Sequence, residues 1–335
     1  MRRFEVQESF GLDNLRITTV PEPALGPGQV RLRVRACCLN YRDLLMVRGH
    51  YDPRLPLPLV PLSDGAGEVV ELGPGVRRVA LGDRVCATFS PSWIAGEPSA
   101  DAVRLTRGGA VPGMLSEQVV LGERELVKVP THLSDVEAAT LPCAALTAWS
   151  ALVTHGGVKA GDVVLTLGSG GVSVFALQIA RLLGARVVST TSNEAKVVKL
   201  RALGAEAVLR YDQEPRWGRE VRKLTGGVDH VVEVGGAGTL AQSLDAVRPG
   251  GTVSLIGVLA GVREPLNVLP VLMKAVRVQG ILVGHRQGFE ALCRAFAASE
   301  LHPVVDRVFP FDRVPEAFDY LASGAHFGKI CIELA

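Results

Sequence analysis

Residues 163–173, VVLTLGSGGVS, constrain the fold of this chain more than any other segment. They combine an apolar run, a glycine-rich turn and the start of a second apolar stretch, which is the order strand, turn, helix. Gly168 allows the tight turn, Gly170 lets the backbone approach a pyrophosphate, and the helix amides that begin at Gly171 face the negative charge. The third glycine position of the pattern holds Ser173, so the match is imperfect. The segment predicts a dinucleotide site, and the alternative is a purely structural turn.

Strand and helix patterns alternate on both sides of this turn. We expect strands at 162–167, 186–190, 207–209, 229–234, 251–257 and 278–283, and helices at 135–154, 172–183, 194–203 and 240–247. Such alternation indicates a parallel sheet with helices on both faces, the doubly wound arrangement. In an open sheet of this kind, ligands bind at the carboxyl ends of strands. Val234, Gly257 and Val283 fall at such ends and are candidate cofactor contacts, although some of these positions can serve only to turn the chain.

The first part of the chain is different, because short strands separated by Gly and Pro dominate it. Residues 31–36 alternate apolar and charged side chains, and further strands are expected at 67–72 and 83–88, which favours a barrel or sandwich. Residues 89–113 lose this periodicity and predict a long surface loop. At the C-terminal end we expect helices at 287–299 and 314–323, and strands at 308–310 and 329–333.

The second strand of the parallel sheet bears on the choice of cofactor. An NAD-binding turn is followed about 20 residues later by an acidic residue that binds the ribose 2′-hydroxyl. Here residues 189–193 read STTSN and contain no acid, so nothing there would repel a 2′-phosphate. Lys196, one helical turn further on, would neutralise that phosphate, or would simply be a solvated side chain. We therefore predict NADP(H) rather than NAD(H).

Composition excludes several other classes of protein. The net charge is +2 and the basic residues are not clustered, which disfavours nucleic acid as a partner. The longest apolar stretch, residues 253–262, is far shorter than the ~20 residues that span a bilayer. Six cysteines occur without a CxxC pair, as is typical of buried thiols in a reducing compartment. We expect a cytoplasmic protein.

Six further motifs appear in order around the glycine-rich turn: residues 40–43 (NYRD), 64–69 (DGAGEV), 82–85 (GDRV), 141–148 (LPCAALTA), 170–172 (GGV) and 248–251 (RPGG). With these six motifs in this order, the chain resembles the medium-chain dehydrogenase/reductase superfamily, and within it the zinc-free quinone oxidoreductase (zeta-crystallin-like) branch. The resemblance extends to His326-Phe327-Gly328-Lys329. It implies an α/β fold with a GroES-like β-rich catalytic domain at residues 1–126 and 286–335 and a doubly wound Rossmann domain at 127–285. It also implies a homodimer or homotetramer.

The same resemblance implies which residues bind the substrate. Asn40, Asp43 and Tyr51 match polar positions that line the catalytic cleft of quinone reductases, and Tyr51 would donate a hydrogen bond or proton to the substrate oxygen. Alternatively, Asn40 and Asp43 only hold the loop and the start of a helix. Tyr41 is a competing donor.

Further positions match cofactor contacts of the family. Thr147 matches a helix residue near the nicotinamide ribose, and otherwise it is a helical Thr bonded to its own backbone. Ser192, Lys196 and Tyr211 match the trio that holds the adenosine phosphate in NADPH-dependent quinone reductases. The motif at 170–172 adds Val172 to Gly168, Gly170 and Gly171 in the predicted cofactor site.

The zinc enzymes of the superfamily carry Cys where this chain has Asn40, and His-Glu where it has Ser63-Asp64. Only their third ligand, a Cys, is matched, by Cys143. A catalytic zinc ion needs three thiolate, imidazole or carboxylate ligands and an open position, so we predict no metal. Cys143 is then a small buried apolar side chain.

Without a metal ion, a protein must stabilise developing negative charge with hydrogen-bond donors. Quinones and enones delocalise that charge and need less help than isolated ketones. The sequence therefore predicts an NADPH-dependent oxidoreductase that delivers hydride to a quinone, enone or related conjugated carbonyl. The alternatives are an alcohol dehydrogenase or aldehyde reductase that uses Tyr51 or Tyr41 as acid, and an NADPH-binding protein of low turnover.

Overall fold

The computed structural model describes residues 1–334, which form two compact units. The β-rich unit comprises Met1–Leu146 and Gly284–Ala335, and the parallel-sheet unit comprises Thr147–Val283. The expected first boundary, after residue 126, therefore falls inside the β-rich unit, because residues up to Leu146 pack with that unit. The second boundary lies at Val283, close to the expected residue 285.

The parallel-sheet unit contains one sheet of six parallel strands in the order β10-β9-β8-β11-β12-β13. The strands are β8 (Val163–Leu167), β9 (Arg186–Thr191), β10 (Ala207–Arg210), β11 (Val228–Glu233), β12 (Val247–Leu255) and β13 (Arg277–Gly280). The helices are α5 (Gly171–Leu182), α6 (Glu194–Ala202), α7 (Trp217–Thr225), α8 (Ala237–Ala246) and α9 (Leu269–Met273). The order reverses between β8 and β11, and right-handed crossovers that run in opposite directions place helices on opposite faces. The predicted doubly wound sheet is confirmed.

The sequence explains why β8 lies at the centre of this sheet. All five of its residues are apolar or Thr, and all five are buried, as expected for a strand covered on both faces. Its neighbours contribute a single apolar core that includes Val188, Val231 and Val253. One expected strand is wrong in extent: β13 ends at Gly280, not at 283. Val283 instead has a left-handed backbone (φ 45°), which no β-strand can accommodate.

The β-rich unit contains a seven-stranded mixed sheet and a separate hairpin. The hairpin pairs β1 (Arg2–Val6) with β2 (Leu15–Thr19). The sheet runs β14-β15-β3-β4-β5-β7, with β6 also paired to β3. Its strands are β3 (Gln29–Leu39), β4 (Asp64–Leu72), β5 (Arg84–Ala87), β6 (Gln118–Gly122), β7 (Leu126–Lys128), β14 (Val305–Pro310) and β15 (Lys329–Glu333). The helices are α1 (Tyr41–Val47), α2 (Ala100–Arg104), α3 (Asp135–Ala138), α10 (Arg286–Ser299) and α11 (Val314–Ala322).

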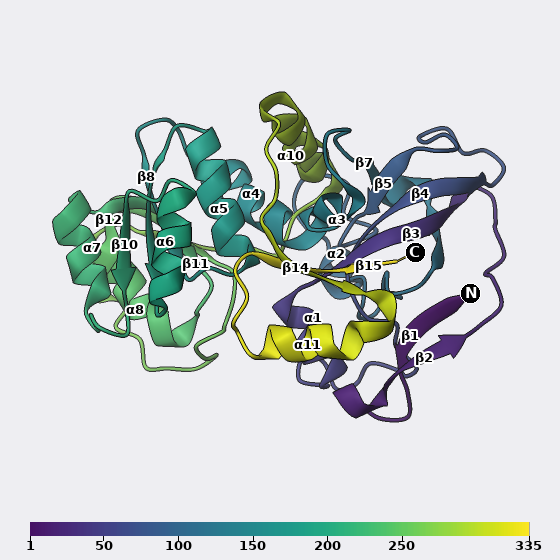
Figure 1. Cartoon of the computed structure of the whole chain (residues 1–335). Coiled ribbons are helices and arrows are strands. Elements are labelled where there is room, and N and C mark those ends of the chain that lie inside the picture. The colour runs from purple at the N-terminus through teal and green to yellow at the C-terminus, as the bar shows by residue number, and fades with distance from the viewer. Residues whose placement is uncertain (335) are drawn as a thin grey trace. The chain divides into compact units, whose positions relative to one another are not determined.

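Strand β3 is central to this unit, since it pairs with β4, β6 and β15. Figure 1 shows β4 and β15 next to it. In its first half, buried residues alternate with partly or fully exposed ones, as the sequence pattern predicts. Its last residues are buried throughout, where β15 covers it. The antiparallel register places Ile330 opposite Leu39 and Cys331 opposite Cys38. This register brings the C-terminal strand to the point where β3 leads into α1.

The helix expected at 135–154 is interrupted. The structure has α3, a π-helical turn at Leu141–Ala145, the short helix α4 (Leu146–Trp149) and a second π-helical turn at Ser150–Thr154. Pro142 has no N–H to donate and its ring crowds the preceding turn, which explains why the regular helix does not continue through this position.

Residues 89–113 do not form the expected surface loop throughout. The segment contains α2 and buries Trp93 and Arg107. The indole N–H of Trp93 donates to Gly96 O at 2.9 Å, and its ring packs edge-on against His285. The Arg107 guanidinium pairs with Glu125 and donates to Pro112 O at 3.2 Å. Trp93 and Arg107 therefore anchor the segment to the β-rich unit.

Among residues 1–334, none of the helices combines the length and the apolar character that a membrane crossing requires.

Candidate functional site

A cluster of buried polar side chains lies in the β-rich unit where β3 ends and α1 begins. Asn40 occupies the N-cap position of α1 and Asp43 lies three residues further on. The backbone N–H of Asn40 donates to Asp43 Oδ2 at 2.8 Å, which is half of a capping box. The structure thus brings Asn40 and Asp43 together, and Asp43 caps the N-terminus of α1.

Asp64 is the first residue of β4 and Ser63 directly precedes it, and both are fully buried. The Ser63 hydroxyl donates to Asp64 Oδ1 at 2.7 Å, and the backbone N–H of Cys143 donates to Asp64 Oδ2 at 3.2 Å. The residue before this pair, Leu62, has a positive φ of 70°, which is strained for a branched side chain. The backbone N–H of Met114 donates to Leu62 O at 2.8 Å, so the end of the 89–113 segment holds the strained turn in place.

Lys329, the first residue of β15, completes the cluster. Its side chain is only 4% exposed, and its Nζ donates to Asn40 Oδ1 at 2.6 Å and to Leu39 O at 2.7 Å. The residue lies 289 positions from Asn40 in the sequence, and the β15–β3 pairing brings the two together. The cluster therefore contains a buried cation as well as two buried carboxyl groups.

The electrostatics of the cluster follow from this burial. Burial raises the pKa of the Asp64 carboxyl to about 6, although the Lys329 ammonium and the Asn40 side chain act in the opposite direction. Burial likewise raises the pKa of Asp43, against the opposing charge of Arg42. The pKa of the Cys143 thiol is raised well above its ordinary range, mainly by burial and then by Asp64. At neutral pH, Cys143 is a thiol and not a thiolate.

Tyr51 is connected to this cluster through Arg42. The Arg42 guanidinium lies 5.4 Å from the centre of the Tyr51 ring and 3.4 Å from Asp43 Oδ1. It also packs on Phe89 at 4.7 Å and donates to Arg107 O at 2.9 Å. Tyr51 itself is 48% exposed.

The competing donor, Tyr41, is the first residue of α1 and is exposed to a similar extent.

The donor set does not fit a zinc ion. At the positions of the three zinc ligands of the metalloenzymes there are a neutral amide (Asn40), a hydroxyl (Ser63) and a single thiol (Cys143). The oxygen of the amide is already bound by the Lys329 ammonium, and this fixed positive charge would repel a divalent cation. Within residues 1–334, no three His, Cys, Asp or Glu side chains are arranged to hold a metal ion.

In the parallel-sheet unit, the glycine-rich turn has the geometry that a pyrophosphate needs. Gly168 has a φ of +73°, and its N–H is bound to Thr190 O at 2.9 Å. Gly170 has an ordinary φ of −77°, yet a β-carbon added there would meet no atom within 4 Å. Glycine is therefore not required by the fold at this position, and the open space beside it at the start of α5 fits a phosphate group. Ser173, at the imperfect third position, donates to Leu167 O at 2.5 Å and ties α5 to the end of β8.

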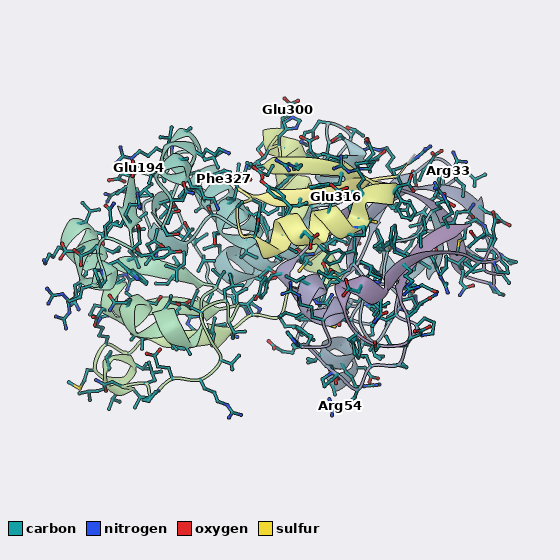
Figure 2. The ribbon with its side chains drawn as sticks, turned by 60° about the horizontal axis from the view of Figure 1, so that its bottom comes forward. Arg33, Arg54, Glu194, Glu300, Glu316 and Phe327 are labelled. Atoms are coloured by element: carbon teal, nitrogen blue, oxygen red, sulfur yellow. The ribbon has the colours of Figure 1, made fainter. Side chains whose placement is uncertain are left out.

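The predicted phosphate trio lies at the neighbouring strand ends β9 and β10. The Tyr211 hydroxyl donates to Ser192 Oγ at 3.0 Å, and Lys196 lies in the first turn of α6. The two acidic side chains nearby, Glu194 and Asp212, are both paired with Arg210, at 2.8 and 2.5 Å. Glu194, labelled in Figure 2, projects outward with its side chain 76% exposed.

The remaining predicted cofactor contacts are spread over the parallel-sheet unit. Val234 immediately follows β11, and Gly257 lies two residues beyond β12, where a β-carbon would come within 2.5 Å of Val234 O. Thr147 is buried in α4. Gly171 and Val172 open α5. The structure thus groups Val234 with Gly257, and Val283 lies beyond the strand that was expected to present it.

Two functional candidates were missed from the sequence. Glu233, the last residue of β11, is fully buried and accepts from the N–H groups of Gly235 and Gly236 at 2.8 and 3.0 Å, so it shapes the turn between β11 and α8. An acidic residue at the end of an otherwise apolar strand was the sequence signal that could have identified Glu233. Lys329 was visible only as the end of a motif, and no local pattern indicated its burial.

Comparison with known proteins agrees with these two units. The family model for alcohol dehydrogenase GroES-like domains matches residues 26–131, and the model for zinc-binding dehydrogenases matches residues 171–298. The chain is 39% identical to a zinc-type alcohol dehydrogenase-like protein of Schizosaccharomyces pombe, over 98% of this chain and 97% of that protein. It is 31% identical to the 2-haloacrylate reductase of a Burkholderia species, over 98% and 97%.

Among solved structures, it is similar to a putative alcohol dehydrogenase of Sinorhizobium meliloti, with a TM-score of 0.93 and 42% identity over 99% and 98% of the two chains. These relatives match both units over almost their whole length, which confirms the expectation from the sequence motifs. The chain belongs to the medium-chain dehydrogenase/reductase superfamily and is an NAD(P)H-dependent oxidoreductase.

Proposed function

We propose that this enzyme transfers hydride from NADPH to a quinone, enone or related conjugated carbonyl without a zinc ion. The observation that carries the proposal is the Asn40–Ser63–Lys329 arrangement, in which hydrogen-bond donors and a buried ammonium occupy the region where the metalloenzymes hold zinc. Reduction of an isolated ketone places a localised alkoxide in the transition state, which a metal ion stabilises best. A conjugated acceptor spreads the same charge over an enolate or quinol anion. The Burkholderia relative, by its name, acts on a conjugated acid.

The chain's own residues would bind and protonate the acceptor. Bound NADPH supplies the hydride, and the acceptor oxygen then carries the negative charge. Asn40 Nδ2 donates a hydrogen bond to that oxygen. Tyr51 supplies one proton, which is replaced from water, so that each turnover consumes one NADPH and one proton. Asp43 keeps the start of α1, and with it Asn40, in position.

The preference for NADP(H) is supported by the ends of β9 and β10. The Ser192–Tyr211 hydroxyl pair and Lys196 would bind a 2′-phosphate. Glu194 and Asp212 would otherwise repel this phosphate, but Arg210 neutralises both of them. We expect tighter binding of NADPH than of NADH, measured by fluorescence titration. Tyr211→Phe and Ser192→Ala should each reduce the ratio of the NADPH affinity to the NADH affinity. Tyr320→Phe, in the β-rich unit, is the matched control.

An alcohol dehydrogenase or aldehyde reductase is the second candidate, because two of the relatives bear such names. One assay panel separates the two functions. NADPH oxidation is measured with 1,4-benzoquinone, 9,10-phenanthrenequinone and simple enones, and alcohol oxidation with NADP⁺, each with and without a chelator. We expect turnover with the conjugated acceptors that chelators leave unchanged. Activity with alcohols alone, abolished by a chelator, would refute the proposal.

The proton donor is tested in the same panel with two matched variants. Tyr51→Phe should lower kcat by about 10²-fold or more, within the range for loss of a general acid. Tyr41→Phe, which removes the other exposed phenol near the cluster, should leave kcat close to that of the wild type. The opposite pattern would assign the role to Tyr41.

We further propose that the enzyme is a homodimer or homotetramer, assembled through the β13 edge of the parallel sheet. Strand β13 is paired on one side only, and exposed apolar side chains of α9, among them Leu272 and Met273, lie next to it in the chain. Exposed apolar patches beside an unpaired edge mark protein interfaces. Leu272→Glu should lower the mass found by light scattering.

None of the six cysteines forms a disulfide within residues 1–334, which supports a cytoplasmic location.

A further inference from the structure

Lys329 is a buried lysine that the mechanism above does not use. Its ammonium group has three protons to donate, and among residues 1–334 it has two hydrogen-bond acceptors, Leu39 O and Asn40 Oδ1. Burial alone lowers the pKa of this ammonium, but the surrounding thiols and the Asp64 carboxylate outweigh burial and raise it. Lys329 therefore carries a positive charge at neutral pH in the interior of the β-rich unit.

This cation determines how the Asn40 side chain is oriented. The two ends of a carboxamide have opposite properties, since the oxygen only accepts hydrogen bonds and the nitrogen only donates them. An ammonium can only donate, so the Lys329 contact at 2.6 Å requires Oδ1 on its side and Nδ2 on the other. Nδ2 then faces Ser63 Oγ at 3.5 Å, which is a long contact, and the Asp64 carboxylate, whose pKa is lowered by hydrogen bonding to the Asn40 side chain. The amide nitrogen is thus held toward Ser63 and Asp64, and it has two N–H groups to share between these acceptors and a ligand.

The same contact makes the amide a better donor. A charged donor on Oδ1 draws electron density toward the oxygen and strengthens the hydrogen bonds that Nδ2 can make, because linked hydrogen bonds polarise one another. The Ser63 hydroxyl gives its own proton to Asp64 at 2.7 Å, so its oxygen can only accept from this nitrogen, and at 3.5 Å it accepts weakly. The group best placed to bind an acceptor oxygen is thus the polarised N–H of Asn40.

We propose that Lys329 is a positioning residue for hydride transfer, which orients and polarises the Asn40 amide so that its N–H binds the oxygen of the acceptor. This inference rests on the proposed function for the identity of the acceptor. It assigns to an internal ammonium, acting through an amide, the electrostatic part that a metal ion plays in the zinc enzymes.

The charge balance of the cluster suggests how to test this role without unfolding the protein. Lys329 opposes the buried Asp64, and Arg42 opposes Asp43. Lys329→Met alone leaves Asp64 without its cation and is expected to be less stable. The double variant Lys329→Met/Asp64→Asn removes both charges and keeps the cluster neutral. Asn40→Asp keeps an acceptor for the Lys329 ammonium but removes the amide N–H.

The first experiment measures kcat and KM with the conjugated acceptor that the wild type reduces best, or with the alcohol if that is the only reaction found. We expect kcat to fall about 10²-fold in both the double variant and Asn40→Asp, with a change of about threefold or less in the affinity for NADPH. Lys274→Met is the matched control, since that lysine donates to three main-chain carbonyls in the parallel-sheet unit. It should lower stability and leave kcat unchanged. Wild-type kcat in the double variant, or in Asn40→Asp, would overturn the inference.

A second readout does not depend on turnover. The chain contains four asparagines, so selective ¹⁵N-asparagine labelling gives four side-chain amide signals in an NMR spectrum. The Asn40 signal is identified by its loss in Asn40→Asp. Asp64→Asn adds a fifth asparagine signal, which the wild-type spectrum lacks. The Asn40 signal should shift in Lys329→Met/Asp64→Asn relative to Asp64→Asn, while the signals of Asn14, Asn193 and Asn267 stay in place. An unmoved Asn40 signal would refute the positioning role, whereas a wild type inactive on every conjugated acceptor would refute only the proposed function.

Discussion

Replacing Asp64 with asparagine should change how the stability of this protein depends on pH. Burial raises the pKa of the Asp64 carboxyl from its ordinary 3.8 to about 6. The folded state therefore binds a proton more tightly than the unfolded state does. By linkage, this group stabilises the fold most at low pH, and its contribution is lost as the pH rises from 3.8 through 6.

The size of the effect follows from the same two values. At 1.36 kcal/mol per pKa unit, the difference corresponds to about 3 kcal/mol of stability lost by pH 7. About 2 kcal/mol of this is lost between pH 4.5 and pH 7, because the carboxyl is already partly ionised in the unfolded chain at pH 4.5. The Asp64 side chain is fully buried, so no discount for solvent screening applies.

The measurement is the difference in unfolding free energy between Asp64→Asn and the wild type, from urea titrations at several pH values. Asparagine also alters the hydrogen bonds with Ser63 and the Cys143 N–H, but this offset is the same at every pH. The unfolding free energy of the variant minus that of the wild type should rise by about 2 kcal/mol between pH 4.5 and pH 7. A difference that is flat over this range would refute the argument that burial penalises the carboxylate.

Asp229→Asn is the control for this series. Burial raises the pKa of Asp229, but the hydrogen bonds from the Val163 N–H and from Arg248 outweigh it and lower the value overall. The stability that Asp229 contributes is present above its unfolded pKa and is lost only in stronger acid. Its variant should therefore show a deficit that stays constant between pH 4.5 and pH 7.

Three further predictions concern stability, cofactor binding and thiol reactivity. Glu125→Ala leaves the Arg107 guanidinium buried without its carboxylate and should lower the free energy of unfolding in urea by about 3–5 kcal/mol. Removal of the acidic partner from the exposed Arg104–Asp101 pair is the control, and an equal effect at both pairs would contradict the reasoning. Gly170→Ala should leave the melting temperature unchanged and weaken NADPH binding, whereas Gly168→Ala should cost about 1–2 kcal/mol of stability because of its positive φ. Cys143 should react with iodoacetamide at pH 8 far more slowly in the native protein than in urea, since burial raises the pKa of its thiol; equal rates would show that the thiol is not protected.

Much of the parallel-sheet unit could be predicted from the sequence, because the patterns that indicate its strands, turns and helices are local. The run at 163–167, the glycines after it and the helix that follows are consecutive, and each reflects a preference of the residues themselves. The failures were also local. Pro142 breaks a helix that the Ala- and Leu-rich composition favours. Trp93 and Arg107 are buried in a segment whose Pro, Gly and Ser content indicated a surface loop.

The candidate site was predicted only in part. Asn40, Asp43 and Tyr51 lie close together in sequence, and the structure connects them through the start of α1 and through Arg42. Lys329 could not be found in the same way, because nothing in its neighbourhood shows that its ammonium is buried.

The sequence by itself therefore determined the order of strands, turns and helices in the parallel sheet, and it predicted which of the turns would hold a phosphate. The tertiary structure alone decided which charges share the interior of the β-rich unit. The antiparallel register of β15 on β3 sets Lys329 beside Asn40 across 289 residues of chain. Local periodicity contains no information about such a register, whereas the free energy of burying an ammonium depends on the acceptors and the carboxylate that it meets there.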